Sequence, residues 1–114
     1  MLALVCGSRT WTDKERIRQV LLEENVTMVR HGAARGADSL AGQVADELLL
    51  PSEAMPADWD KFGRAAGAIR NQAMLDCEPK PDIVIAFWDG KSRGTQHMIR
   101  ISQAAGIPVR IETL

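Results

Sequence analysis

Short apolar runs alternate with helix-like spacing along the whole chain. The compact apolar run 2–6 (LALVC) and the β-branched run 26–31 (VTMVRH) predict two strands. The almost continuous apolar run 82–88 (DIVIAFW) predicts a central strand that is buried on both faces. Residues 52–56 and 107–112 predict two shorter strands, so the pattern indicates a sheet of five.

The segments between these strands have the apolar spacing of amphipathic helices. The predicted helices are residues 10–25, the stretch that follows Asp38, residues from about 64 to 76, and residues 95–106. Thr12 and Glu15 have the spacing of a capping box in the first helix. Asp38 is placed as the N-cap of the second, and we favour this interpretation over a role as an acid. Residues 57–63 are predicted to form a loop.

The alternation predicts one α/β domain that covers residues 1–114, since a chain of this length is a single domain. Right-handed crossovers between parallel strands give a doubly wound, five-stranded parallel sheet with the order 3-2-1-4-5. Ligands bind such sheets beyond the carboxyl ends of the strands, where the strand order reverses. We therefore expect the functional site between the first and fourth strands.

The composition is that of a folded protein, with 46% hydrophobic and 25% charged residues. The net charge of −1 provides no overall field that would attract nucleic acid or an anionic membrane. Any anion site must therefore be local. Ten of the fourteen basic residues are arginine, whose rigid guanidinium suits phosphate and carboxylate.

The two cysteines, Cys6 and Cys77, have neither metal-ligand spacing nor the density of a disulfide scaffold. We interpret Cys6, at the end of an apolar strand, as a small buried hydrophobe. No stretch approaches the length of a membrane span, and the N-terminal apolar run is too short for a signal peptide. We expect a cytoplasmic protein without metal, cofactor or membrane contact, and leave a homo-oligomer open.

Three glycine-containing loops follow strands at the predicted site edge, and their sequences are CGSRTW, HGAARGAD and WDGKSRGT. Glycine lets backbone N–H groups approach a ligand, and the helix N-terminus that follows favours an anion. We expect the small residues to leave room for a phosphate-sized group, with Arg9, Arg35 and Arg93 converging on it. The alternative is tight turns with solvated arginines, but three such loops at one edge favour a site.

Two common phosphate motifs are absent. The first loop lacks the G-x-G-x-x-G pattern of dinucleotide-binding proteins, and Ile85 stands where a P-loop ending in Gly90–Lys91 would need glycine. The sequence therefore disfavours classical NAD enzymes and P-loop NTPases.

Aromatic side chains fall at the same edge. Trp11, Trp59 and Trp88 are candidates for stacking on a base, with packing at the rim of the site as the alternative. His31 and His97 have no acidic partner in a recognisable motif, so we interpret both as ordinary core or surface histidines.

Four segments together resemble the YspA/YpsA-related branch of the SLOG superfamily, and they are CGSRTWTD, HGAARGADSLA, DWDKFGRAAGAIRNQAM and WDGKSRGTQHMI. They cover nearly the whole chain in order, and the specific part is the combination of the GSR loop, the G-A-x-x-G-A-D loop and the A-G-x-x-R-N helix start. The resemblance implies a Rossmann-like fold and ligands derived from nucleotides. It also implies kinship with cytokinin-activating phosphoribohydrolases and DNA-processing proteins.

In the phosphoribohydrolases, an arginine on the third helix and a glutamate in G-G-x-G-T-x-x-E serve the chemistry. Arg70 matches that arginine, and residues 92–95 (SRGT) match the loop. Met98 occupies the glutamate position, and a thioether cannot act as a general acid or base. The resemblance therefore implies binding more strongly than hydrolysis.

The predicted ligand-binding residues are Gly7, Ser8, Arg9, Gly32, Arg35, Gly36, Arg70, Asn71, Gly90, Ser92, Arg93, Gly94 and Thr95. Arg70 and Asp89 are the candidates for a catalytic role. The leading hypothesis is binding of a nucleotide or nucleotide-derived phosphate ligand at the carboxyl edge of the sheet, with a sensor as one such role. One alternative is an N-glycosidic hydrolase of nucleoside monophosphates that uses Asp89 in place of the glutamate. Another is single-stranded nucleic-acid binding through arginines and tryptophans, which the near-neutral charge disfavours.

Overall fold

The protein folds around a five-stranded, wholly parallel sheet with the order β3-β2-β1-β4-β5, which confirms the predicted architecture. The computed structural model describes residues 1–113. The strands are β1 (Leu2–Gly7), β2 (Met28–His31), β3 (Ser52–Ala54), β4 (Ile83–Phe87) and β5 (Val109–Glu112). The helices are α1 (Lys14–Glu23), α2 (Ala37–Glu47), α3 (Trp59–Phe62), the 3-10 turn η1 (Gly63–Ala65), α4 (Ala66–Asp76) and α5 (Arg93–Ala104).

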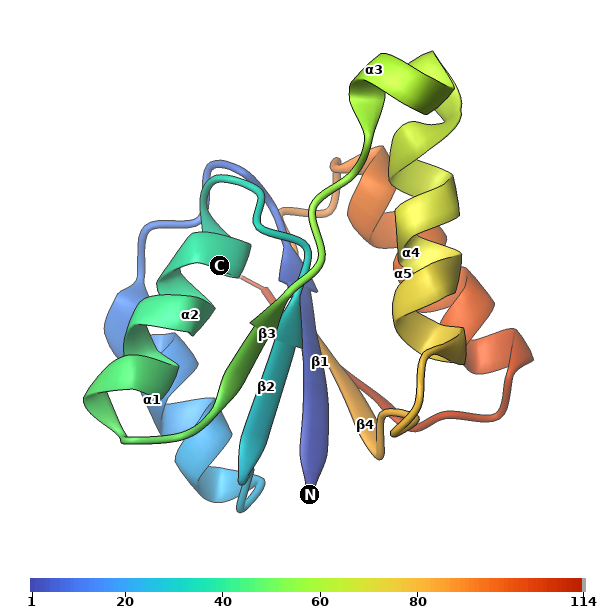
Figure 1. Cartoon of the computed structure of the whole chain (residues 1–114). Helices are drawn as coiled ribbons and strands as arrows, with labels where there is room; N and C mark the ends of the chain where they lie inside the picture. The colour runs from blue at the N-terminus through green and yellow to red at the C-terminus, as the bar shows by residue number, and fades with distance from the viewer. Residues whose placement is uncertain (114) are drawn as a thin grey trace.

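Helices cover both faces of the sheet, with α1 and α2 on one side and α4 and α5 on the other (Figure 1). Every residue of β4 is buried, as expected of a strand with helices on both faces. In β1, Ala3 and Val5 pack with α1 and α2, whereas Leu4 and Cys6 pack with α4 and α5. The two-residue period of a strand therefore divides the apolar residues between two cores.

Helix starts differ from the sequence prediction at α5, which begins at Arg93 rather than Thr95, and at the caps of α1 and α2. The N-cap of α1 is Asp13, whose Oδ1 accepts from the Arg16 amide at 3.0 Å, so the Thr12–Glu15 capping box is wrong by one residue. The N-cap of α2 is Gly36, not Asp38, which lies in the first turn of the helix. The predicted loop 57–63 also contains the single helical turn α3, capped by a side chain at position 58.

One buried arginine fastens α4 to the sheet. Arg30, on β2, has no exposed surface, and its guanidinium donates to the carbonyls of Met74 (2.8 Å), Cys77 (3.2 Å) and Pro79 (3.0 Å). These oxygens lie at and after the end of α4, where helix carbonyls lack intrahelical partners and carry partial negative charge. The Glu53 carboxylate lies 3.4 Å from Arg30 Nε and balances the charge.

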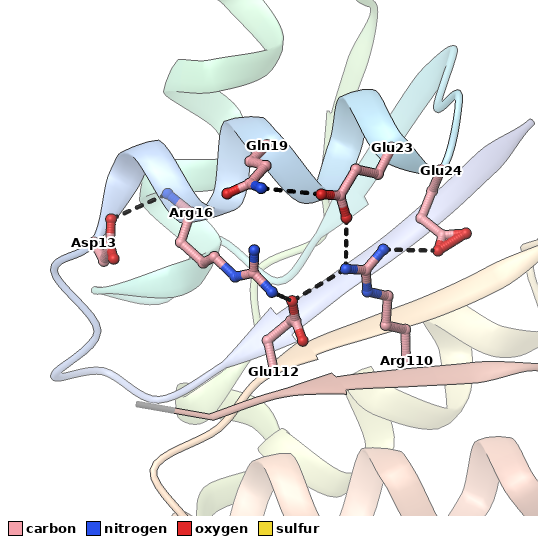
Figure 2. A network of polar contacts seen from close by, with 7 residues as sticks. All are labelled: Asp13, Arg16, Gln19, Glu23, Glu24, Arg110 and Glu112. Atoms are coloured by element: carbon pink, nitrogen blue, oxygen red, sulfur yellow. Dashed lines mark hydrogen bonds and ion pairs between the residues drawn. The ribbon is translucent and has the colours of Figure 1, made fainter.

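A surface network joins α1 to the edge strand β5 (Figure 2). Arg110 on β5 donates to Glu23 at 2.7 Å and to Glu24 at 3.1 Å, and Arg16 on α1 donates to Glu112. Each of the two elements therefore contributes an arginine that pairs with glutamates of the other.

Within the described residues 1–113, no helix has the length and apolar character needed to cross a membrane.

Replacing Arg30 by methionine is expected to lower the free energy of unfolding by about 3–5 kcal/mol, because the α4 carbonyls lose their buried donor while Glu53 loses its counter-charge. Urea denaturation followed by circular dichroism measures the change. The control is Arg100→Met on the exposed face of α5, which should leave the midpoint unchanged. A midpoint for Arg30→Met equal to that of the control would show that the clamp contributes nothing.

Candidate functional site

A cleft of about 690 Å³ opens beyond the carboxyl ends of β1 and β4, where the strand order reverses. Its walls come from the β1–α1 loop, the start of α2, the segment from α3 to α4, and the β4–α5 loop with the first turns of α5. Figure 1 shows α3 projecting beyond the sheet above α4, and Trp59 of α3 lines the cleft. Both layers of helices thus contribute to one cleft.

Four arginines line this cleft, and they are Arg9, Arg64, Arg70 and Arg93. Arg9, Arg70 and Arg93 are among the predicted site residues, and Arg64 is an addition to them. Arg35 differs, because it lines a separate shallow hollow of about 450 Å³ together with Arg9 and residues of α2. The structure thus brings Arg9 and Arg93 together in one lining and places Arg35 outside it.

The glycines of the first two loops leave room for protein atoms rather than for a ligand. A Cβ on Gly7 would collide with the Phe87 carbonyl, one on Gly36 with the Ser8 carbonyl, and one on Gly32 with the Arg70 guanidinium. Gly36 also has φ +74°, a backbone conformation that suits glycine. Our interpretation of these small residues is corrected on this point: they allow neighbouring loops to pack closely.

The third loop is different, because a Cβ on Gly90 or Gly94 would meet open space. Gly94 lies in the first turn of α5, whose leading amides have no partners within the helix. The Ser92 hydroxyl caps one of them, the Thr95 amide, at 3.4 Å. Ser92, Arg93, Gly94 and Thr95 all line the cleft, so the positive end of α5 borders it.

The N-terminus of α2 is engaged by the protein itself. The Ala37 amide at the start of α2 donates to the Ser8 carbonyl at 3.2 Å. The Ser8 hydroxyl accepts from the Asp89 amide at 2.9 Å and is buried. Ser8, predicted as a ligand contact, thus joins the β1–α1 loop to the starts of α2 and of the β4–α5 loop.

A hydrogen-bond chain crosses from α4 to α5. Arg70 Nη1 donates to the Gly32 carbonyl at 2.5 Å, and its Nε donates to Asn71 Oδ1 at 3.1 Å. Asn71 Nδ2 is therefore the donor toward the Gly94 carbonyl (3.3 Å) and His97 Nδ1 (3.1 Å). It follows that Nδ1 of His97 accepts and Nε2 carries the proton. Burial and the charge of a nearby arginine lower the pKa of His97, which keeps the ring neutral at pH 7.

His97 lines the cleft and is a site residue that the sequence analysis missed. Its partner Asn71 lies 26 positions away on another helix, so no local motif could reveal the pair.

Asp38, which the sequence analysis interpreted as a helix cap, is a second residue of this kind. Its side chain turns away from the α2 backbone, and Oδ2 accepts from the amides of Gly32 (3.1 Å) and Ala34 (3.3 Å). The residue is only 5% exposed and lines the cleft. Burial raises its pKa to about 6, although the two amides and the charges of Arg70 and Arg9 oppose this shift. This carboxyl therefore changes its protonation state near physiological pH.

Asp89, the other acidic residue of the lining, has a pKa shifted in the opposite direction. Its Oδ1 accepts from the amides of Lys91 and Ser92, both at 2.8 Å, and these bonds hold its pKa below the usual range. Met98 is fully buried among the apolar residues of β1 and β4. Of the positions considered for acid–base chemistry, Asp38 rather than Asp89 has the pKa of a proton donor.

Cys6 lines the floor of the cleft, and burial raises the pKa of its thiol, so it remains protonated. Among residues 1–113, no group of three or more histidine, cysteine or acidic side chains is arranged to hold a metal ion.

The three tryptophans occupy different environments. Trp11 is buried against Phe87, with ring centroids 5.3 Å apart, and its indole N–H donates to the Asp13 carbonyl. Trp88 packs against the core beside α4 and α5 and donates to a loop carbonyl. Trp59 lines the cleft and is 51% exposed. Stacking on a base is therefore open to Trp59, whereas Trp11 has no free face.

Comparison with known proteins adds two matches. The sequence profile of the YspA, cpYpsA-related SLOG family matches residues 1–62. The Gene 61 protein of Mycobacterium phage D29 is 37% identical over 116 residues, which cover 93% of this chain and 91% of that protein. No solved structure matches the chain.

Replacing Asp38 by asparagine is expected to stabilise the protein at pH 8, because it removes a buried carboxylate while an amide oxygen can still accept from Gly32 and Ala34. A raised pKa means that the protonated carboxyl contributes stability below about pH 4 and that this contribution is lost as the pH rises through about 6. A shift of about two units corresponds to up to about 3 kcal/mol.

The gain should therefore be largest at pH 8 and shrink toward pH 5, as measured by urea melts at both values. Asp89→Asn is the control, and its effect on stability should have the opposite sign. Because hydrogen bonds lower the pKa of Asp89, loss of its carboxylate should destabilise the protein at pH 8. Equal effects of Asp38→Asn at the two pH values would contradict the assignment.

Proposed function

The chain belongs to the YspA, cpYpsA-related SLOG family, and we propose that it binds a nucleotide-derived phosphate ligand in the cleft beyond β1 and β4. Membership of this family supports a nucleotide-related binding or processing role. The location supports it as well, because the cleft lies at the reversal of strand order. Its volume of about 690 Å³ is that of pockets that hold small organic ligands.

The observation that carries the proposal is the meeting of four arginines with the open N-terminus of α5. Guanidinium groups and helix amides both favour a phosphate, and a partly enclosed cleft strengthens them relative to water. In this proposal Arg93 and the amides of the first turn of α5 bind the phosphate. Arg64 from η1 and Arg9 from the β1–α1 loop add positive charge to the same cleft.

Trp59 provides a surface for the remainder of the ligand. Its ring is half exposed and lies over Gly67, where an added Cβ would come within 3.4 Å of the ring. A base stacked on an exposed indole gains dispersion and hydrophobic energy without needing a specific hydrogen bond. The proposed arrangement therefore has the phosphate at α5 and the base near α3.

One observation favours a second candidate function. Asp38 is a cleft carboxyl with a pKa of about 6, the kind of group that serves as a general acid or base. An N-glycosidic hydrolase would use Asp38 rather than Asp89, whose carboxylate is engaged with two amides. Single-stranded nucleic acid is the less favoured ligand, because a net charge of −1 gives little attraction to a long polyanion.

We expect adenosine monophosphate to raise the melting temperature of the protein and Arg93→Ala to weaken its binding about tenfold or more, since a bond from a charged donor contributes about 1.5–3 kcal/mol. Isothermal titration calorimetry at fixed ionic strength measures the affinities. A short single-stranded oligonucleotide in the same series tests the nucleic-acid alternative.

The matched control is Arg35→Ala, which removes another exposed arginine from a neighbouring loop outside the cleft. It should leave the affinity within about twofold of wild type. Equal losses in the two variants would indicate a general charge effect rather than a site at α5.

We further expect binding without appreciable turnover. The position that holds glutamate in the phosphoribohydrolases is the buried Met98 in this chain, and a thioether cannot act as a general acid or base. Chromatography of adenosine monophosphate after long incubation should show no free adenine. Release of adenine that is lost in Asp38→Asn but kept in Asp89→Asn would instead establish the hydrolase.

A further inference from the structure

Asp38 carries a carboxylate oxygen that the fold does not use. Both backbone amides donate to Oδ2, and Oδ1 has no hydrogen-bond partner within residues 1–113. Oδ1 is not fully enclosed by protein atoms, so it retains contact with solvent. Because the side chain is 95% buried and lines the cleft, that contact is through the cleft.

The neighbouring cation does not satisfy this oxygen. Arg70 lies close to Asp38 around Gly32, yet its guanidinium donates to the Gly32 carbonyl and to Asn71, and the two side chains form no ion pair within 4.0 Å. Arg9 also acts on Asp38 only through its charge. The acceptor therefore faces the cleft without a protein donor from α4 or from the β1–α1 loop.

A structural role alone does not require a carboxylate here. One oxygen is enough to accept from the amides of Gly32 and Ala34, and an asparagine side chain offers such an oxygen without a buried charge. Burying an unpaired carboxylate has a cost in folding free energy. Groups that weaken folding in this way are typical of binding and catalytic sites.

We propose that Asp38 Oδ1 accepts a hydrogen bond from a hydroxyl group of the ligand, so that the cleft selects phosphate esters of sugars over simple phosphates. The inference rests on the proposed function, since it assumes that a phosphate binds at α5. A phosphate dianion has only acceptor oxygens and cannot fill this position itself. A cationic donor is disfavoured by the four arginines of the same lining. A neutral donor remains, and in a phosphate ester of a sugar that donor is a hydroxyl group.

The test compares ribose 5-phosphate with methyl phosphate, an ester that has the phosphate but no hydroxyl donor. Calorimetric titration at pH 7.5 uses the wild-type protein, Asp38→Asn and the control Asp46→Asn, which makes the same change on an exposed part of α2. Wild type and Asp46→Asn should bind ribose 5-phosphate at least tenfold more tightly than methyl phosphate. Asp38→Asn should lose this preference while binding methyl phosphate at least as well as wild type.

The outcomes separate the two proposals. A preference that persists in Asp38→Asn, or that wild type does not show, overturns the role of Asp38 and leaves phosphate binding in place. Absence of binding of both esters and of adenosine monophosphate to wild type overturns the proposed function and the inference with it. Because the wild-type comparison changes only the ligand, it tests the preference even if Asp38→Asn is poorly folded.

Discussion

The buried contact between Arg30 and the end of α4 is the constraint on which the cleft depends. Helix α4 buries only Ala66, Asn71, Met74 and Leu75, so apolar packing alone gives it a narrow attachment. The guanidinium of Arg30 adds three hydrogen bonds to carbonyls at and after its end. With that end fixed to β2, the opposite part of α4 holds Arg70 and Asn71 over the carboxyl edge of the sheet.

The loops at this edge support one another in the same way. The Ser8 carbonyl accepts from the amides of Trp11 and Ala37, and the Ser8 hydroxyl accepts from Asp89. The β1–α1 loop therefore fixes α2 and the β4–α5 loop at once. Groups held by such bonds lose little conformational entropy when a ligand arrives, which favours affinity.

The fold could be predicted from the sequence because its information is local: the apolar run of β4 and the periodicity of the helices each lie within a few residues. The site could be predicted only in part. Arg70 and Arg93 follow from loop and helix positions, and the structure places both in the cleft lining. Arg35 lies outside that lining, and a loop position in the sequence does not reveal the direction of a side chain.

Asp38 and His97 show a second limit of predicting the site from the sequence. Asp38 was interpreted as a cap because its position suits one, but a φ of +74° at Gly36 starts the helix earlier and turns the carboxyl toward the loop. His97 acquires its tautomer from Asn71, across a tertiary contact between two helices. Gly32 has a further consequence for Arg70 and Asp38. A Cβ at position 32 would collide with Arg70 Nη1 and lie 2.9 Å from Asp38 Oδ2, so any larger residue there requires both side chains to move. A substitution at position 32 would therefore disturb the cation and the carboxylate of the cleft together, although it introduces no charge itself.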